Sequence, residues 1–217
     1  MRPLLLGHRG ARASRHVAEN TLRSFELCLQ HGCDGFEFDV RRSIDGVAVV
    51  CHDPVISGLE IEKTPASTLG LPNIGLHTLS DVFNHFSARA FLDIELKVAG
   101  LETQLIAALH QNPPQKGYVV SSFLPEVLDC FRDADPGIPL GFLSERAGQL
   151  PPPGQTFAWI IPEVHLLDQA RIERLHTGGQ KAMAWTVNRA EQMKQLTGWG
   201  VDAIISDETE LLVRSLR

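Results

Sequence analysis

Eight short apolar segments alternate with stretches of helical periodicity along the whole chain of 217 residues. Such alternation is typical of a parallel sheet whose strands are connected by helices. The strands are expected at residues 3–7, 35–40, 90–96, 117–121, 138–142, 157–161, 181–186 and 203–205. Eight strand–helix units in a chain of this length are close to the minimum for a (β/α)8 barrel, the TIM barrel. The sequence therefore predicts an α/β fold of this type as a single domain, residues 1–217.

Helices are recognisable in most of the connections between these strands. After Asn20, which we expect to cap the helix, an apolar stripe runs through residues 22–29. Asn188, with Glu191 three residues later, is typical of a capping box. Three consecutive prolines interrupt residues 144–155, where we expect a loop or one helical turn.

The connection after the second strand is longer than a crossover helix requires. Residues 46–53 form a second extended segment directly after that strand, with residues 43–46 as the turn. Residues 53–78 contain several Gly and Pro and lead to a helix beginning near Leu79. This part of the chain therefore adds structure to the plain barrel unit.

Charge and composition exclude several classes of partner. A formal net charge of −6 without a Lys/Arg run argues against nucleic acid, because nucleic-acid-binding proteins need a basic surface. The start of the chain has an apolar run too short for a signal peptide or a membrane span, so we expect a cytoplasmic protein without stable membrane insertion. The four cysteines match no metal-binding spacing and are expected to be reduced. The oligomeric state is not predicted.

Charged residues alternate with apolar ones along the second and third strands. Glu37 and Asp39 lie two residues apart, as do Asp93, Glu95 and Lys97, so each set shares one face of its strand. We expect these faces to point into the barrel mouth, where TIM barrels carry their active sites. Converging carboxylates without thiolates suit a hard cation, Mg²⁺ or Ca²⁺. The alternative is an internal Glu95–Lys97 ion pair, which would leave Glu37 and Asp39 as unpaired like charges.

Two histidines stand at strand ends: His8 after the first strand and His52 after the extended segment that begins at residue 46. Histidine exchanges protons near neutral pH, so two histidines at one rim could serve as the group that accepts a proton and the group that donates one. Either histidine alone would more often be structural. Arg9, beside His8, offers a guanidinium that can hold two phosphate oxygens, and Gly10 would let the backbone approach a ligand. We expect Glu19 to support these side chains from behind.

Several motifs follow one another in a fixed order at the strand ends. They are His8-Arg9-Gly10, Glu19-Asn20-Thr21, the segment 35–40, His52-Asp53, Glu95-Leu96-Lys97, Ser121-Ser122-Phe123, the segment 185–188 and the segment 200–207. With this ordered set the chain resembles the glycerophosphodiester phosphodiesterase family. The resemblance spans nearly the whole chain.

The resemblance implies metal-dependent hydrolysis of small glycerophosphodiesters to glycerol 3-phosphate and an alcohol. It also implies a TIM barrel with a small insertion after the second strand, here residues 41–78, over the active-site face. Carried over residue by residue, it implies His8 and His52 as acid and base, Glu37, Asp39 and Glu95 as ligands of Mg²⁺ or Ca²⁺, Arg9 and Lys97 as phosphate ligands, Phe123 and Trp185 as pocket aromatics, and Glu19 and Asn20 as supporting residues.

Segment 53–78 lacks the Arg-Thr-rich run that is usual in the family, so the roof over the glycerol end is expected to be reduced or altered. A lysophospholipase D-like or other phosphodiester cleavage on the same barrel is an alternative. Charges at Glu60, Glu62 and Lys63 interrupt the apolar residues of that segment and disfavour a membrane-facing surface. A Schiff-base aldolase using Lys97 would leave the histidines and carboxylates unexplained. A non-catalytic binding barrel should have lost at least one of these residues.

Overall fold

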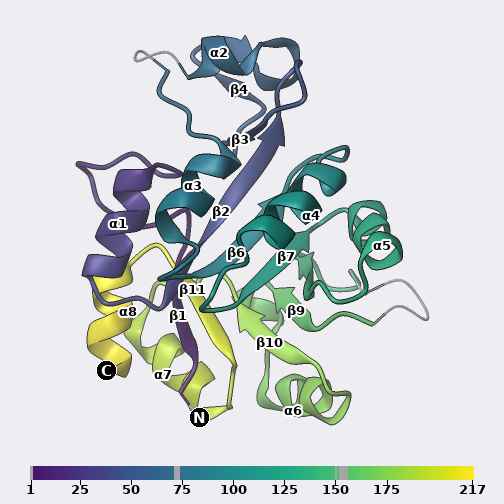
Figure 1. Cartoon of the computed structure of the whole chain (residues 1–217). Helices are drawn as coiled ribbons and strands as arrows, with labels where there is room; N and C mark the ends of the chain where they lie inside the picture. Colours follow the sequence, from purple (N-terminus) through teal and green to yellow (C-terminus); the bar gives the residue numbers. More distant parts are fainter. Residues whose placement is uncertain (1, 71–73, 150, 152–155) are drawn as a thin grey trace.

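The computed structural model describes residues 2–70, 74–149, 151 and 156–217. Within them, eight parallel strands form a closed ring with helices on its outside (Figure 1). The ring strands are β1 (Leu4–Gly7), β2 (Gly35–Arg42), β6 (Phe91–Leu96), β7 (Tyr118–Ser122), β8 (Leu140–Ser144), β9 (Trp159–Pro162), β10 (Lys181–Ala184) and β11 (Ala203–Ser206). The expected TIM barrel is confirmed, with every predicted strand end within two residues of the observed one.

The ring closes between the first and the last strand. β1 pairs with β2 on one side, where Leu6 lies opposite Gly35, and with β11 on the other, where Gly7 lies opposite Ser206. His8 and Asp207 are the residues that directly follow these two strands. Closure therefore places the residues after β1 and β11 beside each other at the carboxyl end of the barrel.

Side chains on the ring strands alternate between the barrel interior and the helix layer. On β2, Phe36 and Phe38 are fully buried among the helices, and Phe36 stacks on Phe25 of α1 (Leu22–Gln30) with ring centroids 4.2 Å apart. Phe86, the last residue of α3 (Leu79–Phe86), packs edge-on against Phe36 at 5.1 Å. Aromatic pairs of this kind each add about 0.5–1.5 kcal/mol beyond their buried area. This packing fixes β2 with its carboxylates directed into the ring.

The remaining described helices are α2 (Ala66–Leu69), α4 (Glu102–Gln111), α5 (Pro125–Ala134), α6 (Gln169–Thr177), α7 (Ala190–Gly198) and α8 (Thr209–Leu216), with 3-10 turns η1 (Ile61–Lys63) and η2 (Val164–Leu166). In the described part of residues 145–155 there is neither helix nor strand, as expected, while residues 150 and 152–155 lie outside the described residues. Across the parts of the chain that the structure describes, no helix combines the length and apolar character needed to cross a membrane.

Two predicted helix caps are wrong. α1 is capped by Thr21, whose side chain accepts a hydrogen bond from the Ser24 amide, and not by Asn20. α7 begins after Arg189 without a side-chain cap. Asn188 does not form the expected capping box because its side-chain amide is bonded to residues that end and follow β11. In both cases the asparagine side chain bonds to residues at the carboxyl end of the barrel, and not to the first turn of the helix.

The segment between β2 and α3 adds an extra strand to the edge of the ring. β3 (Ala48–Val50) runs antiparallel to the last residues of β2, which confirms the second extended segment expected after that strand. The hairpin of β4 (Val55–Ile56) and β5 (Leu59–Glu60), followed by η1 and α2, packs around a small buried cluster that includes Ile61 and Leu69. Figure 1 shows this segment projecting beyond the carboxyl end of β2. His52, two residues after β3, is thereby brought back toward the barrel mouth.

Candidate active site

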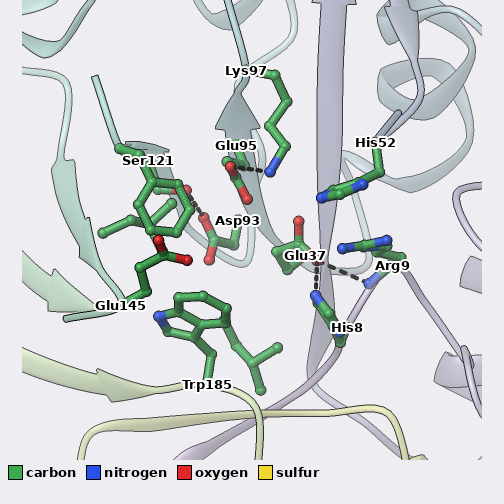
Figure 2. A pocket seen from close by; sticks show the side chains of 13 residues that line it. His8, Arg9, Glu37, His52, Asp93, Glu95, Lys97, Ser121, Glu145 and Trp185 are labelled. Atoms are coloured by element: carbon green, nitrogen blue, oxygen red, sulfur yellow. Dashed lines mark hydrogen bonds and ion pairs between the residues drawn. The ribbon is translucent and has the colours of Figure 1, made fainter. Parts of the chain in front are cut away.

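A cavity of about 220 Å³ lies at the carboxyl ends of the ring strands (Figure 2). Of the eleven residues expected in the site, eight line this cavity: His8, Arg9, Glu37, His52, Glu95, Lys97, Phe123 and Trp185. The other three lie behind it: Glu19 and Asp39 contact lining residues through their side chains, and Asn20 bonds to Asp39 and, through its backbone, to Arg9. The structure thus brings the whole expected set together.

Three buried carboxylates meet on β2 and β6. Register pairs Asp39 with Glu95, and Glu37, Asp39 and Glu95 each offer one oxygen such that all three lie within 4.8 Å of one another. Glu37 Oε1 is buried without a hydrogen-bond partner. Burial, with the nearby Asp39, raises the pKa of Glu37 well above its ordinary value and the pKa of Glu95 to about 7. Three clustered carboxylates, one with a buried oxygen that lacks a partner, fit a divalent cation. Its charge would offset the repulsion between the ionised carboxylates.

Asp39 differs from the other two carboxylates because two cations contact it directly. Its Oδ1 lies 3.2 Å from Lys97 Nζ, and its Oδ2 lies 3.2 Å from Arg9 Nε. Burial acts to raise the pKa of Asp39, but Lys97 and Arg9 outweigh it and lower the pKa below its usual value. Lys97 also contacts Glu95, so the ion pair weighed as an alternative is present. It does not involve Glu37, whose Oε1 stays without a partner, and the case for a cation is unchanged.

Arg9 is held from several sides. Its backbone N–H donates to Glu37 Oε2 at 2.9 Å and its Nη1 to Glu19 Oε1 at 2.7 Å. Its φ of 52° lies in the left-handed region, which is uncommon for a residue other than glycine and clusters at functional sites. At Gly10, with φ 83°, a Cβ would lie 2.5 Å from Ser24 Oγ on α1. A side chain at Gly10 would therefore clash with α1, and its positive φ also favours glycine.

Asn20 is buried and acts on Asp39. Its Nδ2 donates to Asp39 Oδ2 at 2.7 Å, and its Oδ1 accepts from the Asp39 amide at 3.3 Å. Its φ of 56° is incompatible with the extended backbone of a helix cap, which Thr21 adopts with φ −121°. Asn20 thus supports the carboxylate cluster, as Glu19 supports Arg9.

His8 is tied to a carboxylate from the far end of the chain. Its Nδ1 lies 2.8 Å from Asp207 Oδ1, and its Nε2 lies 3.9 Å from Glu37 Oε2. Asp207 also accepts hydrogen bonds from Arg12 Nη1 at 3.2 Å and from Asn188 Nδ2 at 2.7 Å. Burial acts to raise the pKa of Asp207, but the contacts with His8, Asn188 and Arg12 hold it well below its usual range. An ionised, fixed Asp207 therefore sets the orientation of the His8 ring.

His52 reaches the cavity from the other side, with Glu37 and Arg9 between the two histidines in Figure 2. Its backbone carbonyl accepts from Arg41 Nε at 2.7 Å, and its Nδ1 lies 2.7 Å from Asp53 Oδ1. Burial lowers the pKa of His52, and Lys97 and Arg9 add to this, against the opposing effect of Asp53. Neutral imidazole is therefore favoured at pH 7.

The two expected aromatic residues form one wall of the cavity. Phe123 and Trp185 meet edge to face, with ring centroids 5.6 Å apart and an interplanar angle of 78°. Trp185 Nε1 donates to the carbonyl of Ile161 at 2.9 Å, which fixes the indole. Lys97 Nζ lies 5.7 Å from the centroid of the Phe123 ring. The wall is rigid and directly adjoins the charged part of the cavity.

The sequence profile of the Glycerophosphoryl diester phosphodiesterase family matches residues 8–71 and 93–211 of the chain. The chain belongs to this family. The matched ranges include His8, His52 and the carboxylates of β2 and β6 that line the cavity.

Relatives of this family resemble the chain over nearly its full length. It is 30% identical over 250 residues to the glycerophosphodiester phosphodiesterase of Caldanaerobacter subterraneus subsp. tengcongensis, with 100% of this chain and 99% of that protein covered. A phosphodiesterase structure from Oleispira antarctica, in complex with the product sn-glycerol-3-phosphate, superposes with a TM-score of 0.83 at 26% identity, covering 99% of this chain and 96% of that one. The structure of the glycerophosphodiester phosphodiesterase of Thermotoga maritima gives 0.81 at 25% identity, with 99% and 98% covered.

Several residues that line or contact the cavity were given no role in the site by the sequence analysis. Asp207 and Asn188 stand within the family motifs of the last two strands, and ring closure could have linked them to His8. Asp93 was expected on the inward face of β6 without a role in the site; there its Oδ1 accepts from Ser121 Oγ at 2.6 Å and burial raises its pKa to about 7. Glu145 follows β8 in a connection with no sequence pattern to mark it.

Proposed function

We propose that this family member hydrolyses small glycerophosphodiesters to glycerol 3-phosphate and an alcohol, with a divalent cation and with His8 and His52 as the proton-transferring groups. Family membership supports the reaction class. The observation that carries the roles is that both histidines line one cavity with Glu37, a member of the buried carboxylate cluster, between them (Figure 2). General acid and base must both reach the reacting bond, and this arrangement allows it.

Glu37, Asp39 and Glu95 would hold the cation. Their ligand atoms are all carboxylate oxygens, which favours Mg²⁺ or Ca²⁺. When bound, such a cation supplies positive charge that polarises the phosphoryl group and offsets the charge developing on its oxygens. Asn20 keeps the Asp39 carboxylate in place through two hydrogen bonds.

Arg9 and Lys97 bind the phosphate in this proposal. Glu19 and Asp39 hold two nitrogens of the Arg9 guanidinium, which orients the third. The nearby carboxylates raise the pKa of both Arg9 and Lys97 against the lowering effect of burial, so both side chains stay charged. Fixed positive groups beside the phosphate stabilise the charge that builds on its oxygens during transfer.

His52 accepts the proton of the attacking hydroxyl, because its lowered pKa favours the neutral ring at pH 7. The attacking group is either the glycerol 2-hydroxyl or a water molecule. His8, oriented through Nδ1 by Asp207, gives a proton from Nε2 to the leaving oxygen. In this proposal the insertion 41–78 covers the active-site face and contributes His52 as part of the cavity wall.

The direct test incubates the purified protein with glycerophosphocholine and glycerophosphoethanolamine in the presence of Mg²⁺, of Ca²⁺ or of a chelator, and measures released glycerol 3-phosphate. Release with a cation and its loss with chelator are expected. Release that persists in chelator would refute the cation site alone. No release in any condition would refute the proposed function. Lysophosphatidylcholine under the same metal conditions, with released choline measured instead of glycerol 3-phosphate, tests the lysophospholipase D-like alternative.

A further inference from the structure

The cavity has two chemically different halves. The half around Glu37 contains His8, Arg9, His52 and Lys97. The opposite half, which we call the acidic wall, is formed by Asp93, Ser121, Phe123, Glu145 and Trp185 with apolar residues from β8 and β11. Among the described residues that line the acidic wall, none is basic, and two are carboxylic acids. A substrate held at the first half by its phosphate would direct one of its two alcohol groups at this wall.

Asp93 contributes a buried acceptor that lacks a partner. The residue is 0% exposed on β6, and its Oδ1 is bonded to Ser121 Oγ. Its Oδ2 has no hydrogen-bond partner. Figure 2 shows the Asp93 side chain within the cavity, between Ser121 and Glu37. Buried polar atoms in native structures nearly always have a partner, so this oxygen indicates a ligand that brings an N–H or O–H group.

Glu145 adds negative charge at the mouth of the same wall. It directly follows β8, and its side chain is 47% exposed. Its carboxylate lies beside Trp185 in Figure 2, and its Oε1 is 3.3 Å from Nε of the largely exposed Arg146. The backbone amides of Glu145 and Arg146 donate to Gln149 Oε1 at 2.8 and 2.9 Å, which holds this turn in shape. The carboxylate is therefore presented by an ordered turn.

The aromatic residues of the acidic wall offer π faces between the two acids. The edge-to-face arrangement of Phe123 and Trp185 leaves ring surface in the cavity, and the Trp185 hydrogen bond to Ile161 keeps it there. Aromatic faces attract ammonium groups within about 6 Å of the ring centroid. Lys97, 5.7 Å from the Phe123 centroid, is itself paired with Asp39 and Glu95. Trp185 is thus the ring available to a ligand cation.

We propose that the acidic wall binds a primary ammonium group, so that the protein prefers glycerophosphodiesters whose alcohol carries one, as in glycerophosphoethanolamine. This inference rests on the proposed function. A primary ammonium brings an N–H donor for Asp93 Oδ2 and a positive charge for Glu145 and Trp185. A quaternary ammonium brings the charge without the donor, and a neutral polyol brings the donor without the charge.

The test compares kcat/KM for glycerophosphoethanolamine, glycerophosphocholine and the neutral glycerophosphoglycerol at one ionic strength with saturating Mg²⁺. The ammonium substrate is expected to exceed the neutral one by about tenfold, as a charge-assisted hydrogen bond and a ring contact would give. The choline substrate should lie between them. Glu145→Gln should reduce the ethanolamine-to-glycerol ratio by about 2- to 5-fold, since the carboxylate is half exposed. Asp93→Asn should reduce the same ratio further.

Glu173→Gln, an equal charge change on the exposed face of α6, is the matched control and should leave the ratio unchanged. Equal kcat/KM for all three substrates in the unmodified protein would overturn the inference while the proposed function stands. A loss that is equal for all three substrates in Asp93→Asn would also overturn it, because the wall would then bind the shared glycerol. No turnover of any substrate would instead count against the proposed function.

Discussion

The two histidines reach one cavity from parts of the molecule that are built differently. His8 lies at the end of β1, is 9% exposed, and bonds to Asp207, which is itself held by Asn188 and Arg12. His52 lies after the added strand β3 with a side chain that is 34% exposed. Its partner Asp53 is 72% exposed and has to compete with water. The barrel orients the first histidine through a fixed partner, whereas the second depends on its backbone position.

The strongest test of this comparison removes each imidazole in turn. His8→Ala and His52→Ala should each lower kcat by about 10²–10⁴, since a general acid and a general base are both required whatever their surroundings. The measurement is steady-state hydrolysis of glycerophosphoethanolamine with Mg²⁺. His110→Ala, at a surface histidine paired with Asp135, is the control and should keep full activity. Near-normal turnover in either site variant would end that histidine's assignment.

Replacing the carboxylate partners of the histidines, Asp207 and Asp53, should affect the two histidines to different degrees. Asp207→Asn should lower kcat by about 10- to 100-fold with little change in KM, because it releases the His8 ring from its orientation. Asp53→Asn should lower kcat by no more than about 5-fold, the effect of an exposed ion pair. Both variants are compared at pH 7 with the same substrate. Equal losses would show that the buried partner has no special part in orienting its histidine.

The cluster of Glu37, Asp39 and Glu95 should respond to cation and pH together. Raised pKa values of Glu37 and Glu95 mean that the protonated acids stabilise the metal-free fold below about pH 4. The contribution of Glu95 is lost as pH rises through about 7, and that of Glu37 is lost as pH rises through its own raised pKa. A cation replaces those protons. At about 100 times its Kd it should raise Tm by about 5–10 °C at pH 8, and by less at pH 6. Glu37→Gln should remove most of the difference, and a cation effect independent of pH would contradict the cluster as its site.

A smaller effect concerns stability on the His8 side. The lowered pKa of Asp207 contributes stability that is present above the unfolded-state pKa of about 3.9 and is lost as pH falls through lower values. Asp207→Asn should therefore lower Tm by about 4–8 °C at pH 7, and the difference should shrink near pH 3. Asp53→Asn should change Tm by about 2 °C or less. The measurement is thermal unfolding monitored by circular dichroism at both pH values. If the Tm difference between Asp207→Asn and the unmodified protein persisted near pH 3, it would come from lost packing and not from the lost charge.

Local periodicity predicted one part of the site and could not predict the other. The inward direction of Glu37, Asp39 and Glu95 follows from alternation along a strand, so the sequence was sufficient. Asn20 was expected to cap a helix because local pattern cannot show that its side-chain amide donates to Asp39 on β2. The His8–Asp207 contact joins residues 199 apart and exists only once the ring is closed.

Ring closure also determines when, during synthesis of the chain, the active site can form. His8 is synthesised before its orienting carboxylate, Asp207, which follows 199 residues later. At about 5–20 residues per second, a ribosome needs about 10–40 s to join the two ends of this contact. Until β11 has taken its place beside β1, the nascent chain contains the histidines and carboxylates without the geometry that would let them act. The active-site geometry therefore cannot form before β11 has been synthesised and has paired with β1.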